Sequence, residues 1–322
     1  MVKKKWILIG LYITLLSGCS SFDGLYSSND VENSESISIT NKLLTNRSAA
    51  CSDYVGRYTS YVKDVATNTY YNGDLTISTD NETCVFKSNS IPNHDFNNGN
   101  SSFVNAIKEV NETVTINQSP FLATTTTDLT LQRNNAILLN GVKLDLLAAG
   151  CFGIADGKTG CNDSDSNKAW RYDPMSTLNN FGTDSHNAHT QPDGAYHYHG
   201  NPKALFEESN PIVESPVIGF AADGFPIYGS YILDNGALRK VKSSYQLKSY
   251  ARQAKGTEEN GDFPGSIYNG QYRDDYEYIE NLGDLDECNG MTHNGSYGYY
   301  VTDSYPWVLN CFKGTPDPSF TK

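Results

Sequence analysis

The sequence predicts a mainly β protein: an antiparallel, sandwich-like β domain with long loops and a few short helices. Short segments alternate apolar and polar residues, as half-buried strands do, at 75–77, 114–116, 129–131, 136–139 and 217–220. Asn-Gly and Asp-Gly pairs, which favour hairpin turns, recur at 72–73, 140–141, 193–194, 223–224, 235–236 and 294–295. The 22 tyrosines add to a composition that favours strands.

Helix signals are scarce. Short helices are predicted near 104–109 and near 203–208, where the second segment follows Pro202. Long loops are expected over 150–200 and 255–295. Because binding and catalytic residues concentrate on loops, we look for function there first.

The N-terminal segment predicts the compartment. Lysines 3–5 precede an apolar run over 6–16 that is too short to span a bilayer. The following LSGC (16–19) resembles the lipobox of bacterial lipoproteins, which implies cleavage before Cys19 and its acylation, with palmitate among the added chains. A plain membrane anchor or an ordinary secretory peptide is the alternative. Ser20 resembles the residue found after the cysteine in outer-membrane lipoproteins, so we expect a lipid-anchored protein of the cell envelope, on the periplasmic or surface face of the outer membrane.

The expected domain organisation has three parts. Residues 1–18 form the signal peptide, and residues 19–50, which are rich in Ser, Asn and Asp, form a flexible linker after the lipidated Cys19. Residues 51–322 form one domain, within which 51–145 is a candidate N-terminal β subregion. This length suffices for one large core or two subdomains.

The charge excludes two classes of partner. The formal net charge is −13 at pH 7, and removing lysines 3–5 takes it to −16. Such a charge argues against nucleic acid and against direct docking on anionic lipid. The lipid anchor is then the expected contact with the membrane, and a small-molecule, glycan or protein partner stays open.

Cysteine usage predicts disulfides. Apart from Cys19 the chain has six cysteines, an even number, as expected of an exported disulfide-bonded protein. Fifteen connectivities are possible, and proximity in the sequence favours Cys51–Cys84, Cys151–Cys161 and Cys288–Cys311. No Cys-x-x-Cys is present, which disfavours a redox-active or zinc-finger role.

Four of the six histidines lie within residues 186–199. In a strand, His197 and His199 would point to one face, and Tyr196 and Tyr198 to the other. With His189 on the incoming segment, these imidazoles make a cluster suited to a transition metal. The alternative is that each histidine forms hydrogen bonds within a polar core.

Residues 193–199 (DGAYHYH) are echoed by residues 294–300 (NGSYGYY), in which Gly298 and Tyr300 replace the two histidines. We interpret the echo as two similar hairpins with aromatic packing faces rather than as an ancient duplication, because one short match is not a repeat series. In both interpretations the tyrosines are predicted to have a structural role. His197 and His199 are predicted to be additions to the shared hairpin pattern.

Ordered motifs extend over most of the chain: NSIPNHD (89–95), LNGV (139–142), NAHTQPDGAYHYHG (187–200), GFAADGFPIYG (219–229), DYEY (275–278), GDLDECNG (283–290) and FKGTP (312–316). On these motifs the chain resembles the YHYH-domain proteins of bacterial exported and lipoprotein fractions, from about 84 to 320. The resemblance brings His94 into the candidate site but carries no established activity. His186 stands where similar proteins often have Asn, which makes it a weaker candidate, and many lack a cysteine at the position of Cys311.

The favoured function is binding or delivery of a transition metal, copper or zinc, through His197, His199, His189 and His94. His186, Asp223, Asp286 and Glu287 are weaker candidate ligands. One alternative is a metal-dependent extracytoplasmic hydrolase in which Asp223, Asp286 or Glu287 acts as general base. The other is a carbohydrate- or protein-binding module without metal, with tyrosines stacking on the ligand. The sequence carries no Gly-x-Ser-x-Gly, His-Glu-x-x-His, P-loop or dinucleotide fingerprint, and it leaves open whether the protein is an enzyme.

Overall fold

A computed structural model describes residues 31, 34–100, 102–154, 160–162, 170–252 and 264–322. The predicted signal peptide, Cys19 and the first part of the predicted linker lie outside the described residues. None of the helices in the described ranges has both the length and the apolar character needed to cross a bilayer.

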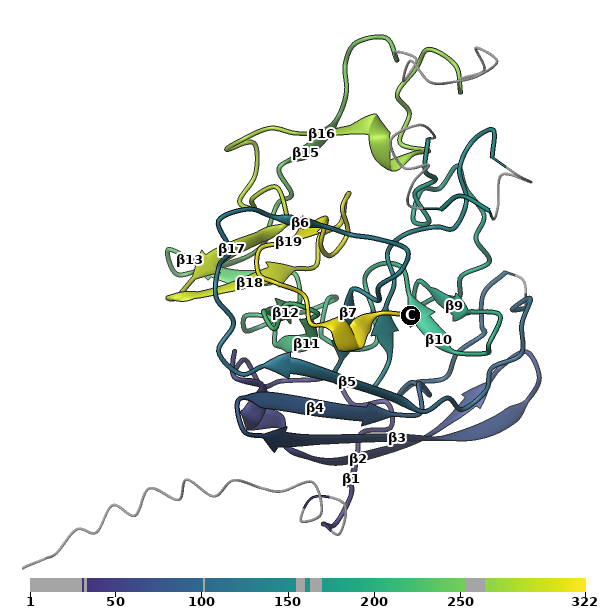
Figure 1. The fold of residues 1–322 in the computed structure, drawn as a ribbon, viewed down its shortest axis with the longest axis vertical. Coiled ribbons are helices and arrows are strands. Elements are labelled where there is room, and N and C mark those ends of the chain that lie inside the picture. Colours follow the sequence, from purple (N-terminus) through teal and green to yellow (C-terminus); the bar gives the residue numbers. More distant parts are fainter. Residues whose placement is uncertain (1–30, 32–33, 101, 155–159, 163–169, 253–263) are drawn as a thin grey trace, which may run out of the picture.

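Two stacked β-sheets form the body of the protein, with the five-stranded sheet below the second sheet in Figure 1. The five strands lie in sequence order, and all neighbours are antiparallel except β1 and β2. They are β1 (Ile37–Ser38), β2 (Gly56–Asp64), β3 (Thr69–Asp80), β4 (Thr83–Ser88) and β5 (Glu112–Asn117). The strand that we predicted over 75–77 is part of β3, and that over 114–116 is part of β5.

The second sheet has eight strands in the order β17-β18-β12-β11-β7-β8-β10-β9. They are β7 (Ala136–Leu138), β8 (Lys143–Leu144), β9 (Ala188–Thr190), β10 (Tyr196–Tyr198), β11 (Val217–Ala221), β12 (Pro226–Tyr228), β17 (Gly290–His293) and β18 (Ser296–Tyr300). Because β7 and β8 belong to this sheet, the candidate subregion 51–145 contributes strands to both layers. The prediction of a mainly β, sandwich-like domain is confirmed.

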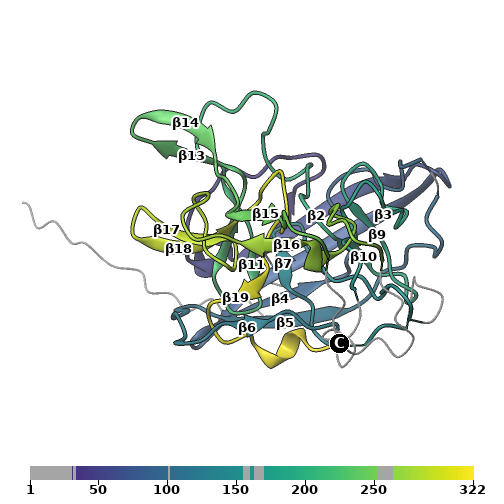
Figure 2. The same ribbon diagram turned by 90° about the horizontal axis from the view of Figure 1, so that it is seen from above.

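Smaller elements of secondary structure lie around the two main sheets. Three two-stranded sheets pair β6 (Thr127–Asp128) with β19 (Cys311–Phe312), β13 (Tyr231–Asp234) with β14 (Ala237–Lys240), and β15 (Tyr245–Leu247) with β16 (Tyr276–Tyr278). Figure 2 shows the β13–β14 hairpin projecting from the body. Among the described residues there are 3-10 turns at η1 (Cys51–Tyr54), η3 (Arg273–Asp275) and η4 (Pro318–Phe320).

Neither predicted helix forms. Residues 104–109 and 203–208 adopt bends and turns. The backbone amide of Lys108 donates to Gly194 O at 3.0 Å and that of Val110 to Asn89 O at 3.1 Å, so tertiary partners take the amides that a helix would use. A six-residue helix is too short to compete with such contacts.

Part of the segment expected to be a linker is folded. Its strand β1 pairs in parallel with β2, and the Leu44 amide donates to Leu205 O at 2.8 Å. The apolar Ile39 is 9% exposed. From residue 34 onward this segment therefore covers an edge of the first sheet.

One predicted turn was wrong. Asn72-Gly73 lies within the long strand β3, whereas the other five pairs that we predicted as turns do lie in turns. A Cβ at Gly73 would lie 2.1 Å from Ser60 Oγ and 2.9 Å from Ile91 O. Glycine is needed here for a close approach between neighbouring chain segments, not for a turn.

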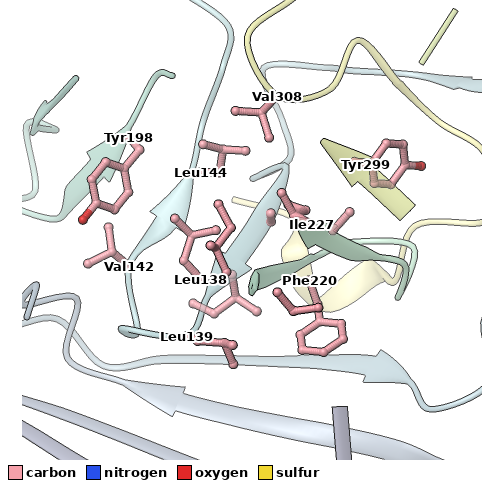
Figure 3. Close-up of a cluster of buried hydrophobic side chains, with 14 of the residues drawn as sticks. Leu138, Leu139, Val142, Leu144, Tyr198, Phe220, Ile227, Tyr299 and Val308 are labelled. Atoms are coloured by element: carbon pink, nitrogen blue, oxygen red, sulfur yellow. The ribbon is translucent and has the colours of Figure 1, made fainter. Parts of the chain in front are cut away.

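The core lies between the two sheets and is one continuous cluster of buried apolar side chains. Figure 3 shows Leu138 and Phe220 near its centre, with Tyr198 on one side and Tyr299 on the other. The described cysteines form the disulfides Cys51–Cys84, Cys151–Cys161 and Cys288–Cys311, as predicted.

The eight-stranded sheet has an approximate two-fold relation. Strands β7, β8, β10 and β9 run outward from its centre in one half, and β11, β12, β18 and β17 run outward in the other. In each half the first pair is antiparallel, the second parallel and the third antiparallel. At the centre Phe220 pairs with Ile137, and this pair lies on the axis that relates the halves.

Hydrogen bonds repeat across this relation. Tyr196 Oη donates to Asp184 Oδ2 at 2.8 Å, and Tyr297 Oη donates to Asp286 Oδ2 at 3.0 Å. The amide of Asp184 donates to Ala188 O at 2.8 Å, as that of Asp286 does to Gly290 O at 2.8 Å. The match therefore extends well beyond the seven echoed residues. It favours two related halves over our interpretation of two merely similar hairpins.

Candidate metal centre

The β9–β10 hairpin brings three histidines together. His189 on β9 and His197 on β10 are direct cross-strand partners. His199 follows β10 two residues after His197, so both side chains lie on the same face of the strand. The His199 amide donates to Asn187 O at 2.9 Å, which holds the strand end against the incoming segment.

The three Nε2 atoms converge. His197 Nε2 is 3.0 Å from His199 Nε2, which is 3.1 Å from His189 Nε2. One ligand atom from each of the three residues lies within 4.8 Å of the others. Tetrahedral coordination at the usual Zn–N distance separates ligand nitrogens by about 3.3 Å, so the spacing fits one shared ion.

Backbone carbonyls face two of the other ring nitrogens. His189 Nδ1 lies 2.6 Å from Phe181 O, and His197 Nδ1 lies 3.5 Å from Ala195 O. A carbonyl accepts a hydrogen bond from Nδ1–H, which keeps the proton on Nδ1 and leaves the Nε2 lone pair free, as in metal-binding histidines.

Burial favours the neutral imidazoles. His197 and His199 are 2% and 4% exposed. Burial, followed by the neighbouring His199 and His189, holds the pKa of His197 well below its usual range, and burial followed by His189 does the same for His199. Burial also lowers the pKa of His189. A neutral imidazole can present an Nε2 lone pair to a metal ion, so burial keeps these rings in the form that a metal binds.

A cavity of about 590 Å³ opens beside the cluster, and all three histidines line it. Asp145 lines it too, and the sequence analysis missed this residue. Its side chain is 4% exposed and accepts from Gln191 Nε2 at 2.9 Å and from Lys322 Nζ, both through Oδ2. Burial raises the pKa of Asp145, while Lys322 opposes the shift. Only its position just after β8, the neighbour of β10, could have signalled it.

His94 and His186 do not join the cluster. His94 Nε2 lies 2.6 Å from Tyr198 Oη, and Tyr198 points to the face of β10 opposite His197 and His199. The His94 and His186 rings lie 3.9 Å apart. Burial, and secondly His186, lowers the pKa of His94 to about 3. Together the buried His94 and the half-buried His186 form a separate pair.

The predicted carboxylates lie in the other half of the sheet. Asp223 Oδ2 accepts from Tyr299 Oη at 2.6 Å and from the Gly314 amide at 2.9 Å. Asp286 binds Tyr297, and Glu287 Oε1 accepts from Lys313 Nζ at 2.8 Å. These carboxylates hold β18 and its surroundings in place, and they lie outside the cavity that the three histidines line.

The other half has no equivalent cluster. The positions of His189, His197 and His199 are occupied by Met291, Gly298 and Tyr300. A Cβ at Gly298 would lie 2.5 Å from the Tyr228 ring, which fills the space beside this strand. The hairpin architecture therefore forms without histidines at these three positions.

Comparison with known proteins identifies the family. The model of the YHYH protein family matches residues 113–314, which include both halves of the second sheet, and the chain belongs to this family. No curated protein and no solved structure matches the chain.

Proposed function

We propose that the protein binds one transition-metal ion through His189, His197 and His199. The observation that carries the proposal is the convergence of three Nε2 atoms, with two of the rings oriented through Nδ1 by backbone carbonyls. Imidazole ligands suit zinc and copper, and three protein ligands leave a coordination position open toward the cavity. Binding or delivery of the metal is the primary role.

The related half of the sheet supports this proposal. Its hairpin has the same strand order, pairing and tyrosine–aspartate bonds, with Met291 and Gly298 in place of His189 and His197. The fold therefore does not require imidazoles at these positions. Two buried histidines and one half-buried histidine that the architecture does not need are best explained by a ligand.

A metal-dependent hydrolase is the second candidate. A carboxylate near an open zinc position can orient or deprotonate a water, and Asp145 lines the same cavity as the three histidines. It replaces Asp223, Asp286 and Glu287, which lie elsewhere, as the candidate general base.

The proposal includes the cell-envelope location. An export signal and acylation of Cys19 would place the domain on a membrane in an oxidising compartment, where its three disulfides are stable. Labelling cells with a palmitate analogue tests this. The wild-type chain should take up the label and fractionate with the outer membrane, and Cys19→Ala should do neither. A labelled Cys19→Ala chain would contradict the assignment.

Elemental analysis tests the metal site directly. The exported protein, purified without an affinity tag or chelator, should hold about one zinc or copper per chain. The double variant His197→Ala/His199→Ala should lose it while keeping the far-UV spectrum of a folded β protein. His293→Ala, which changes a histidine paired with Glu214 on β17, is the matched control and should keep the metal. A folded wild-type protein that takes up neither metal after reconstitution would overturn the proposal.

A further inference from the structure

The cavity beside the three histidines has the size and lining of a small-molecule site. Its volume of about 590 Å³ lies within the range of ligand pockets in proteins. Leu131, Leu147, Ala148, Phe181 and Pro192 form most of the apolar part of its wall. A site that served only to hold an ion would not need an apolar chamber of this volume.

Asp145 lines this cavity and carries an unused acceptor. Its Oδ2 is held by Gln191 and Lys322, whereas its Oδ1 is buried and has no hydrogen-bond partner. A buried acceptor without a partner costs about 1–3 kcal/mol, so such an atom is expected to meet a donor when the site is filled. Gln191 and Lys322 hold the carboxylate through Oδ2, so its position is fixed while Oδ1 stays without a partner.

We infer that the cavity binds a small organic molecule with three features: an oxygen anion for the open metal position, an N–H or O–H donor for Asp145 Oδ1, and an apolar body that packs on the cavity wall. This inference rests on the proposed metal site and names the ligand class of that site. Asp145 recognises the ligand and is not itself a metal ligand.

Benzohydroxamate is a probe with all three features, because its oxygens bind zinc, its N–H can reach a carboxylate and its ring is apolar. We expect the zinc-loaded protein to bind it at least tenfold more tightly than acetohydroxamate, which lacks the ring. Asp145→Asn should weaken benzohydroxamate binding at least tenfold and leave the zinc content unchanged. Glu109→Gln, which changes an exposed carboxylate outside the cavity lining, should have no effect.

A second variant guards against a folding artefact. Ala149 is an exposed residue of the cavity lining, so Ala149→Trp should narrow the cavity without disturbing the core. It should weaken benzohydroxamate binding by a similar factor and leave acetohydroxamate binding unchanged. Titration calorimetry and zinc analysis are performed on the same samples.

Two outcomes separate the proposals. If zinc is present but benzohydroxamate does not bind, or binds equally to wild type, Asp145→Asn and Ala149→Trp, the ligand inference is overturned and the metal site stands. If the folded wild-type protein holds no zinc or copper, the proposed function fails and the ligand inference fails with it.

Discussion

His189 and His197 are direct cross-strand neighbours on β9–β10, and Met291 and Gly298 take the same two places on β17–β18. One sheet therefore contains a hairpin with clustered histidines and, at its opposite edge, a related hairpin without histidines at the corresponding positions. The second hairpin serves as an internal reference, because it shows what the architecture requires when no ligand site is present.

The glycine of the second hairpin should be essential for its packing. A side chain at Gly298 would run into the Tyr228 ring, which itself stacks on Tyr300 with ring centroids 5.1 Å apart. We expect Gly298→Ala to lower the free energy of unfolding by about 1–3 kcal/mol through overpacking. Urea denaturation measures this, with Ser296→Ala on the same strand as the control. The metal content should not change, because Gly298 lies in the half of the sheet without the histidine cluster. An unchanged free energy of unfolding would contradict the close approach of Gly298 to the Tyr228 ring.

The buried His94 should make stability depend on pH. Its pKa is about 3 in the folded protein and about 6.5 when unfolded, so between these values the unfolded chain binds the extra proton. The stabilisation is fully present above pH 6.5 and is lost as the pH falls toward 3, at about 1.4 kcal/mol per pH unit. His94→Gln keeps a hydrogen-bonding group for Tyr198 but does not titrate. Urea denaturation of metal-free protein at pH 6.5 and 4.5 should show a smaller loss for this variant, and equal losses would refute the assignment.

Tyr299 and Tyr198 occupy corresponding positions in the two halves, but their hydroxyl groups should contribute differently to the free energy of unfolding. Tyr299 Oη donates to the buried Asp223 carboxylate, whereas Tyr198 Oη accepts from the neutral Asn140 Nδ2 at 3.0 Å. Hydrogen bonds to charged groups contribute about 1.5–3 kcal/mol and those between neutral groups about 0.5–1.5 kcal/mol. We therefore expect Tyr299→Phe to destabilise the protein more than Tyr198→Phe. Chemical denaturation of the two variants side by side compares their losses in free energy of unfolding. A larger loss for Tyr198→Phe would contradict the prediction.

The Cys288–Cys311 disulfide should stabilise the second half. It links the segment before β17 to β19 and spans 23 residues, a loop length for which chain entropy predicts about 3 kcal/mol. Replacing both cysteines by alanine should lower the midpoint of unfolding while the metal content stays the same. Loss of metal in a folded double variant would contradict this prediction. It would mean that the disulfide in one half of the sheet affects the histidine cluster in the other half.

Local patterns in the sequence predicted much of this protein. Alternation and turn residues predicted the β-sandwich class and the hairpins at 140–141, 223–224 and 294–295, because period-two side-chain patterns and Asx-Gly turns act over a few residues. The same rule placed His197 and His199 on one face and added His189 from the adjacent segment. Cysteine proximity predicted the disulfide pairs for the same local reason.

Long-range packing decided the rest. His94 lies on the opposite face of β10 from His197 and His199, and Asp223, Asp286 and Glu287 belong to the other half of the sheet. Asp145 enters the site because β8 pairs in parallel with β10 across more than fifty residues of chain. Gly73 lies in a strand and not in the predicted turn, because Ser60 and Ile91 approach it closely. The sequence alone determined which residues could carry the chemistry, whereas only the tertiary structure decided which of them meet, because strand order is set by burial between distant segments and not by local preference.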